Sequence, residues 1–234
     1  MKVHVIIQAR LGSKRLPGKV LTPIVRYNSL ELIYKRISKS KLINGIFFAI
    51  PNNKKNLKLK KFITQEINCA VFLGSEKNVL NRYYLAAKRF KSDIIVRITG
   101  DCPLVDSEII DEYIQILRKD NLDYVYNGHP HTYPDGLDVE VFTYEALKKA
   151  NKHAIKFVQK EGVTRYFRDN LKKFKVRHVS CPIKNVSHLR ITLDTYEDLL
   201  LIKKIYKYFY PKVIFSWKRI VKFYRLNKKN FNNS

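Results

Sequence analysis

Cysteine is scarce in this sequence, and the few cysteines lie far apart. Only three, Cys69, Cys102 and Cys181, occur among 234 residues, and no two form a Cys-x-x-Cys pair. This spacing excludes a disulfide framework and gives no zinc-binding signature. We therefore expect reduced thiols. Cys102 alone lies beside a candidate site, and we interpret it as a small packing residue rather than a nucleophile.

Long apolar runs are also missing. No run approaches the roughly 20 residues that a membrane-spanning helix requires, and Met1-Lys2 leads straight into a short apolar segment rather than a secretory signal. We therefore expect a cytoplasmic protein. The chain is long enough for one large domain, which we place at residues 1–210, followed by a basic, aromatic segment over residues 211–234.

Acidic residues are few compared with basic ones. The chain has 20 Asp and Glu against 46 Lys and Arg, a net charge of +26. Such an excess attracts polyanions in general, including nucleotides and anionic lipids. Because the excess is mostly lysine spread along the chain, it does not single out nucleic acid, and we expect no nucleic-acid partner.

Short apolar runs alternate with segments of helical periodicity. Strands are expected over residues 3–7, 45–50, 69–73, 93–98, 123–126, 137–142, 174–180 and a stretch ending at 193. Helices are expected over residues 29–37, 55–67, 75–90, 107–117, 144–151, 158–170 and from 194 onward. This alternation predicts an α/β fold with a Rossmann-like, mainly parallel sheet sandwiched by helices.

The loop after the first strand is rich in cations and glycine. The apolar run over residues 3–7 predicts a strand buried on both faces, and four cations, two glycines and a proline follow it within residues 8–19. Glycine lets the backbone approach an anion that the cations neutralise, and ligands of open α/β sheets bind beyond the carboxyl ends of the strands. The loop matches neither the P-loop nor the Gly-x-Gly-x-x-Gly pattern.

Two aspartates, Asp101 and Asp194, each follow an expected strand. Magnesium is commonly held by one or two carboxylates together with phosphate oxygens and water, so either residue is a candidate metal ligand. The alternative is a helix-capping role, which is strongest for Asp194 because it opens an acidic first helical turn.

A third acidic segment, YPDGLDVEVF, covers residues 133–142. The alternation puts Asp138 and Glu140 on one strand face, after a turn that contains Asp135. We interpret the three acids as a site for a hydroxyl-rich ligand or a further metal contact; a hairpin with solvated acids is the alternative. His129 and His131 have no third ligand at a suitable spacing, so we predict no zinc site.

These segments together resemble the cytidylyltransferases that join CTP to ulosonic acids such as sialic acid and Kdo, above all the branch typified by the spore coat polysaccharide biosynthesis protein SpsF. The matching segments are Gln8-Ala9-Arg10, Gly12-Ser13, and residues 15–21, 74–76, 79–80, 82–84, 97–106 and 133–142. The resemblance covers roughly residues 3–202. It implies a nucleotide-diphosphosugar transferase fold, CTP and a sugar as substrates, Mg²⁺ as cofactor and a homodimer.

The resemblance also implies residue roles. CTP would be bound by Ala9, Arg10, Gly12, Ser13, Lys14, Arg15, Lys19, Ser75 and Arg82, with Arg10 and Lys19 acting on the charge that develops in catalysis. Asp101 and Asp194 would hold magnesium, and Asp135, Asp138, Glu140, His188 and Arg190 would bind the sugar. Some sialic-acid enzymes carry an aspartate where this chain has Thr192, which puts the details of metal coordination in doubt.

Two other functions stay open. A glycosyltransferase that uses a finished nucleotide sugar has a similar sheet, but it would be expected to show an Asp-x-Asp motif, whereas only Asp101 is present. The second is a polyanion- or membrane-binding module, because no acidic residue follows Leu199 and lysines alternate with aromatics there. That segment either lies on an anionic membrane or docks on its own domain, and residues 227–234 are expected to be disordered.

Overall fold

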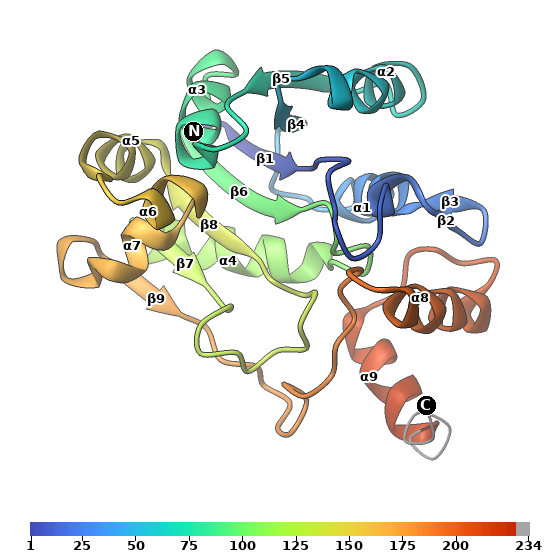
Figure 1. Cartoon of the computed structure of the whole chain (residues 1–234). Helices are drawn as coiled ribbons and strands as arrows, with labels where there is room; N and C mark the ends of the chain where they lie inside the picture. The colour runs from blue at the N-terminus through green and yellow to red at the C-terminus, as the bar shows by residue number, and fades with distance from the viewer. Residues whose placement is uncertain (228–234) are drawn as a thin grey trace.

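The computed structural model describes residues 1–227 and has a central seven-stranded sheet (Figure 1). The strand order is β5-β4-β1-β6-β8-β7-β9. The strands are β1 (Val3–Gln8), β4 (Gly45–Pro51), β5 (Ala70–Gly74), β6 (Ile94–Thr99), β7 (Tyr124–Tyr126), β8 (Glu140–Thr143) and β9 (Val176–His178). The short β2 (Pro23–Ile24) and β3 (Tyr27–Asn28) form a separate antiparallel pair.

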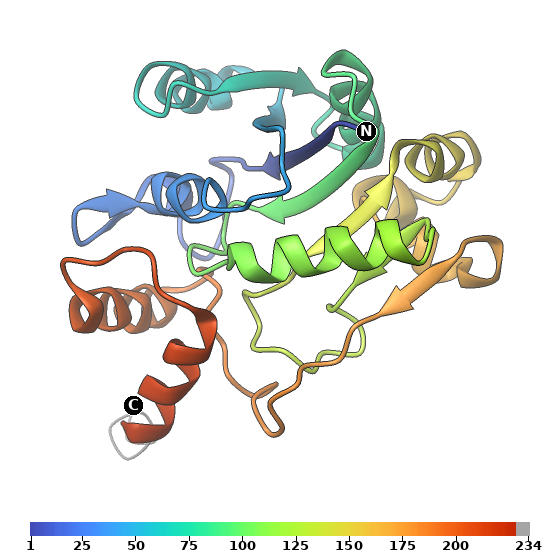
Figure 2. The same cartoon turned by 180° about the vertical axis from the view of Figure 1, so that it is seen from behind.

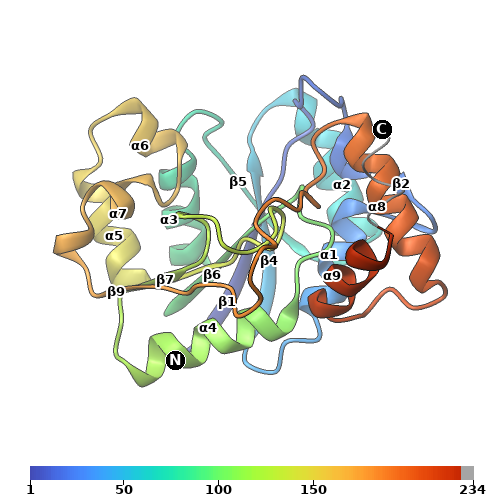
Figure 3. The same cartoon turned by 90° about the horizontal axis from the view of Figure 1, so that it is seen from below.

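The helices of the described chain cover both faces of the sheet. They are α1 (Ser29–Ile37), α2 (Leu57–Gln65), α3 (Val79–Arg89), α4 (Ser107–Lys119), α5 (Tyr144–His153), α6 (Phe157–Glu161), α7 (Arg165–Asp169), α8 (Tyr196–Phe209) and α9 (Trp217–Leu226). Figure 3 shows α3, α5, α6 and α7 on one side of the sheet, and α1, α2, α8 and α9 on the other. The predicted α/β sandwich is confirmed.

Strand β1 lies at the centre because its residues are apolar on both faces. Val3, Val5 and Ile7 belong to one hydrophobic core, and Ile6 belongs to the core on the opposite face. β1 pairs in parallel with both β4 and β6. The chain therefore runs outward from β1 in one direction through β4 and β5, and in the other through β6. This reversal is the switch point of the sheet, where ligands of open α/β folds bind.

The far half of the sheet departs from pure parallel order. β8 is antiparallel to both β6 and β7, whereas β7 and β9 are parallel. The expected strand over 137–142 is shortened to Glu140–Thr143. The expected strand ending at residue 193 is wrong: this segment is a loop with a single isolated bridge between Asp135 and Arg190.

Two predicted helix boundaries are also corrected. The helix expected over residues 158–170 is broken into α6 and α7, because Gly162 adopts an extended conformation after α6. The helix expected from Ser75 begins at Val79, with Asn78 as its N-cap, because the Asn78 side chain accepts a hydrogen bond from the Asn81 N–H.

The C-terminal helix α9 packs on the domain. Trp217, Ile220, Val221 and Phe223 are each at most 3% exposed and belong to the main core. Figure 2 shows α9 beside α8, at the edge of the face that α4 crosses. No helix within residues 1–227 is long and apolar enough to cross a membrane. Contact of residues 211–234 with a membrane surface stays a prediction. Of residues 227–234, predicted to be disordered, Asn227 is the C-cap of α9, and the others lie outside the described residues.

Candidate functional site

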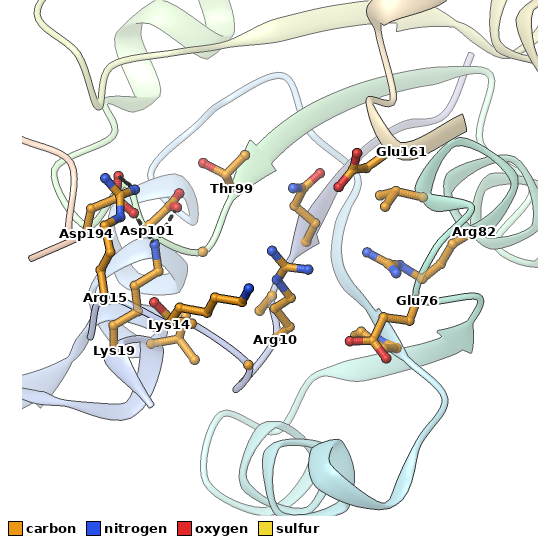
Figure 4. A pocket seen from close by; sticks show the side chains of 18 residues that line it. Arg10, Lys14, Arg15, Lys19, Glu76, Arg82, Thr99, Asp101, Glu161 and Asp194 are labelled. Atoms are coloured by element: carbon orange, nitrogen blue, oxygen red, sulfur yellow. Dashed lines mark hydrogen bonds and ion pairs between the residues drawn. The ribbon is translucent and has the colours of Figure 1, made fainter. Parts of the chain in front are cut away.

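A pocket of about 840 Å³ opens at the carboxyl ends of β1 and β6. Figure 4 shows the aspartates Asp101 and Asp194 at one end and Glu76, Arg82 and Glu161 at the other. The residues that line it are Gln8, Ala9, Arg10, Gly12, Ser13, Lys14, Arg15, Lys19, Val20, Pro51, Glu76, Val79, Arg82, Thr99, Gly100, Asp101, Glu161 and Asp194. All of the predicted nucleotide-binding residues except Ser75 are among them, as are both predicted metal ligands.

The basic loop after β1 is folded by its own backbone. The Gly18 N–H donates to the Leu11 carbonyl at 3.4 Å, and the Leu11 N–H donates to Asn56 Oδ1 at 3.0 Å. Gly18 has a φ of +69°, a left-handed conformation that glycine adopts without strain. A short 3₁₀ turn, Lys19–Leu21, follows at once and buries Val20 in the core. This anchoring directs Lys19 into the pocket while the rest of the loop stays at its rim.

Asp101 and Asp194 converge on one ammonium group. Lys19 Nζ lies 2.8 Å from Asp101 Oδ2 and 2.7 Å from Asp194 Oδ1. The Lys19 side chain is only 11% exposed, so the interaction is shielded from solvent. Arg15 binds the other oxygen of Asp194 at 2.8 Å. The two aspartates, which lie 93 positions apart in the sequence, thus form one acidic pair that cations neutralise.

Backbone contacts bring the two aspartates together. The Asp101 carbonyl accepts hydrogen bonds from the Leu193 N–H at 2.7 Å and from the Thr192 hydroxyl at 3.2 Å. Thr192 therefore joins the two acidic segments. Gly100 permits this arrangement, since a Cβ there would lie only 3.0 Å from the Gln8 carbonyl oxygen.

Neither aspartate serves as a helix cap. The N-cap of α4 is Asp106, and the N-cap of α8 is Thr195. The alternative interpretation of Asp101 and Asp194 as capping residues is therefore wrong, and both carboxylates are free to face the pocket.

Asp198, which the sequence did not single out, orients Asp194. Its Oδ2 accepts the N–H groups of Asp194 and Thr195, each at 2.8 Å. Its carboxylate also binds Arg190, whose guanidinium reaches Asp135 and Asp194 at 3.0 and 2.8 Å. Arg190 is therefore bound by three carboxylates of the protein itself.

The charges of this cluster hold one another in the ionised form. Burial lowers the pKa of Lys19, but the carboxylates of Asp101 and Asp194 outweigh it, and the pKa lies above its usual range. Burial raises the pKa of Asp194, but Lys19, Arg190 and Arg15 overcome this effect and bring it below its usual value. Lys19 is thus protonated and Asp194 is ionised at neutral pH.

The opposite end of the pocket carries an unsatisfied donor. Arg82 is 4% exposed, and its Nε has no hydrogen-bond partner within the described structure. Its NH1 donates to the Ser75 carbonyl at 2.5 Å. The Ser75 hydroxyl accepts a hydrogen bond from the Asn78 N–H, so this side chain stabilises the turn before α3. Because buried donors are rarely unpaired, Arg82 Nε is suited to a ligand acceptor.

The residues predicted to bind the sugar are not all brought together. Asp135 is bound to Arg190. Burial raises the pKa of Asp135 above its usual value despite Arg190. Asp138 lies near His131, with 3.7 Å between Oδ1 and Nδ1. Burial raises the pKa of Asp138 to about 6, against the opposing effect of His131.

Glu140 is buried next to Asp138, whereas His188 lies on the surface. Glu140 is 4% exposed and is ion-paired with Arg97 and Arg168, which offset the effect of burial and keep its pKa low. This geometry favours a structural role beneath the site. His188 is exposed, and its ring lies 6.3 Å from that of Tyr224 in α9.

Several residues that line the pocket were assigned no role from the sequence. Glu76 and Glu161 line the pocket from the segment before α3 and from α6, and Gln8 and Thr99 line it at the ends of β1 and β6. Glu161 lies in the helix expected over residues 158–170, where a surface position accounts for a polar residue equally well, so only its place in the folded pocket identifies it. Gln8 and Thr99 were inside matched segments, so their positions at strand ends were a usable signal.

The acidic pair fits a divalent cation that binds together with a phosphorylated ligand. Among residues 1–227 no group of three or more His, Cys, Asp or Glu side chains could hold a metal ion by itself. Two carboxylates suffice for magnesium, however, when phosphate oxygens and water supply the remaining ligands. The ammonium between Asp101 and Asp194 marks a cation position.

A basic pocket at the switch point of a mainly parallel sheet, with two convergent carboxylates, defines a protein of the nucleotidyltransferase class. The sequence profile of one family, described as cytidylyltransferase, matches residues 4–227. The chain therefore belongs to the cytidylyltransferase family and is a nucleotidyltransferase enzyme.

Individual relatives agree with this assignment. The spore coat polysaccharide biosynthesis protein SpsF of Bacillus subtilis is 32% identical over 208 residues, covering 86% of this chain and 85% of SpsF. A 3-deoxy-manno-octulosonate cytidylyltransferase of Geotalea daltonii is 31% identical over 121 residues, 52% of this chain and 47% of that protein. The structure of a cytidylyltransferase from Leptospira borgpetersenii superposes with a TM-score of 0.93 at 30% identity, covering 100% of this chain and 98% of that one.

Proposed function

We propose that this enzyme transfers CMP from CTP to a sugar hydroxyl and releases pyrophosphate, in the synthesis of a surface polysaccharide or glycan. The observation that carries the proposal is the convergence of Asp101 and Asp194 on one cation beside a pocket lined by Arg10 and Lys14. Such a pocket combines cations for a triphosphate with carboxylates for its metal. Membership of the family and the similarity to SpsF support the same reaction.

The chemical step is an in-line substitution at phosphorus. The sugar hydroxyl oxygen forms a bond to the α-phosphorus of CTP, the bond from that phosphorus to the bridging oxygen of pyrophosphate breaks, and the hydroxyl proton is lost. Catalysis of phosphoryl transfer rests mainly on positioning and charge stabilisation. Arg10, Lys14, Arg15 and Lys19 would hold the triphosphate, with Arg10 and Lys19 stabilising charge on the α-phosphate and the leaving group.

Asp101 and Asp194 would hold the magnesium ion, which when bound neutralises phosphate charge and polarises the phosphoryl oxygens. Arg190 and Asp198 keep Asp194 oriented toward that position. Arg82, with its free Nε, would bind the cytidine end of the nucleotide.

The sugar would be an acidic ulosonic type with eight or nine carbons. Asp135 and Asp138 would bind its hydroxyls: Asp135 shares Arg190 with Asp194, and Asp138, with its raised pKa, can donate as well as accept hydrogen bonds near pH 6. Arg190 is already saturated by three carboxylates, so a substrate carboxylate would share it rather than find it free. The similarity to a 3-deoxy-manno-octulosonate cytidylyltransferase supports this sugar class.

The test is pyrophosphate release with Mg²⁺, each of the four NTPs and a panel of sugars that includes ulosonic acids. We expect release with CTP and one sugar class only. Asp101→Asn should lower turnover at least about 100-fold, the size of effect that a lost electrostatic group produces in such sites. Glu145→Gln is the matched control, because this carboxylate is 76% exposed on α5 and should leave the rate unchanged. If no NTP is consumed but a nucleotide sugar binds, the glycosyltransferase alternative replaces this proposal.

A further inference from the structure

Two cations of the pocket are bound to the acidic pair itself. Lys19 bridges Asp101 and Asp194 at 2.8 and 2.7 Å, and Arg15 binds Asp194 at 2.8 Å. By contrast Lys14, which lines the same pocket, makes no hydrogen bond or ion pair with any carboxylate of residues 1–227 and extends into the open space (Figure 4). The pocket therefore contains two kinds of cation, those already paired and those available.

The paired cations compete with a metal ion. A magnesium ion would approach these oxygens to about 2.0–2.1 Å, whereas Lys19 Nζ already binds one oxygen of each aspartate. Two positive charges a few ångströms apart in a partly buried site repel each other strongly. While Lys19 stays where it is, a metal ion that reaches both aspartates meets the ammonium charge at close range and loses one oxygen of each carboxylate.

We propose that Lys19 and Arg15 are exchangeable counterions that keep the metal site closed until the nucleotide arrives. This inference rests on the proposed function of the pocket. The triphosphate draws both cations onto its own oxygens, and the aspartates are then free for the metal. Metal and nucleotide consequently bind with positive cooperativity, and each binds weakly alone.

Arg190 does not take part in this exchange. It contacts Asp194 at 2.8 Å, but Asp135 and Asp198 bind its other nitrogens at 3.0 Å each. These contacts hold the guanidinium in place when one partner changes. Arg15 lacks such anchors: its side chain is 62% exposed, and its ion pair is with Asp194. The movable cations thus lie on the basic loop, and the fixed one lies beside α8.

The test measures metal binding directly. Mn²⁺ is titrated by electron paramagnetic resonance, with and without a non-hydrolysable CTP analogue, in the wild type, Lys19→Met, Lys19→Arg and Lys14→Met. Without nucleotide, Lys19→Met should bind Mn²⁺ about tenfold more tightly than the wild type, within the usual range of coupling between sites. Lys19→Arg keeps the charge and should stay weak. Lys14→Met removes the same charge from the same pocket and should change the affinity far less.

The nucleotide arms complete the test. The analogue should tighten Mn²⁺ binding about tenfold or more in the wild type and much less in Lys19→Met, because the competing cation is already gone. Circular dichroism and thermal unfolding establish that each variant is folded. If Lys19→Met does not fold, Lys19→Gln, which can still donate to one carboxylate, repeats the comparison.

The outcomes separate the two proposals. If Asp101→Asn does not weaken Mn²⁺ binding in the presence of the analogue, the metal site is wrong and the exchange fails with it. If Asp101→Asn weakens binding but Lys19→Met leaves the nucleotide-free affinity unchanged, the exchange alone is wrong.

Discussion

At the scale of single residues, the site depends on carboxylates whose partners fix their direction. Asp198 is 8% exposed and accepts the N–H groups of Asp194 and Thr195 while binding Arg190. It does not line the pocket, so its effect on catalysis passes through Asp194. We therefore regard Asp198 as a positioning residue for the acidic pair.

Replacing Asp198 should impair metal use more than nucleotide binding. In Asp198→Ala the orientation of Asp194 is lost, and we expect kcat/KM to fall about tenfold, a modest share of what a direct electrostatic contact provides. Most of this loss should reflect weaker magnesium binding, seen as a rise in the magnesium concentration that gives half of the maximal rate of pyrophosphate release. Glu197→Ala, a change at an exposed position in the same helical turn, is the control. An unchanged magnesium dependence in Asp198→Ala would rule out this role.

Asp138 gives a prediction for the pH dependence of stability. Burial raises its pKa from 3.8 to about 6, so between these values the folded protein binds more protons than the unfolded chain. Stability from this group is therefore present at low pH and is lost as the pH rises through 6. Because the side chain is 29% exposed, we expect an effect of only about 1 kcal/mol.

The comparison is made between the wild type and Asp138→Asn by urea unfolding at pH 4.5 and pH 7. The variant should be more stable than the wild type at pH 7 by about 1 kcal/mol and nearly equal at the lower pH. Since the remaining carboxylates are common to both proteins, the difference isolates Asp138. An Asp138→Asn variant that is less stable than the wild type at both pH values would show that burial does not disfavour the ionised carboxylate of Asp138.

At the scale of secondary-structure elements, one buried arginine joins three parts of the chain. Arg36 of α1 is 2% exposed and donates hydrogen bonds to carbonyls before α4 and before α9. Its acceptors are Leu104, Val105, Val213 and Phe215. The Trp217 N–H, at the start of α9, donates to Asp106 at 2.6 Å. α9 is therefore bound by polar contacts as well as by its apolar face.

Arg36→Met should destabilise the protein by about 3 kcal/mol, because several buried carbonyls lose their donor at once. Urea unfolding followed by tryptophan fluorescence measures this change and reports on α9 directly through Trp217. Arg26→Met, at an exposed position between β2 and β3, serves as the control. A loss below about 0.5 kcal/mol, typical of surface substitutions, would contradict the role assigned to Arg36.

The elements also show what periodicity can predict. Helix α1 was predicted with both ends correct, and β4 and β6 to within a residue, because apolar spacing and turn residues are local signals. The break at Gly162 was missed. The loop before Asp194 was mistaken for a strand, because Leu189, Ile191 and Leu193 alternate as in a strand but are buried by tertiary packing. Asp198 and Arg36 were missed for a related reason. Their partners lie elsewhere in the chain, and sequence spacing carries no record of them.

At the scale of the whole molecule, the net charge of +26 acts on the approach of an anionic substrate. Long-range attraction raises association rates and weakens as salt shortens the screening length, which is about 10 Å at 0.1 M. We expect kcat/KM for CTP to fall severalfold between about 0.05 and 0.5 M KCl, with a smaller change in kcat. Steady-state kinetics at constant free magnesium measure this, and the same salt series run at saturating CTP is the control. A kcat/KM for CTP that is insensitive to salt would exclude steering by the basic surface.

The central claim is that CMP, and no other part of CTP, moves to the sugar. It is tested most directly by following [α-³²P]CTP and [γ-³²P]CTP in parallel reactions with magnesium and the sugar that supports pyrophosphate release. We expect the α label in a sugar nucleotide and the γ label in pyrophosphate. Neither labelled product should form with Asp101→Asn. Transfer of the γ label to the sugar, or no consumption of CTP with any sugar, would contradict the account.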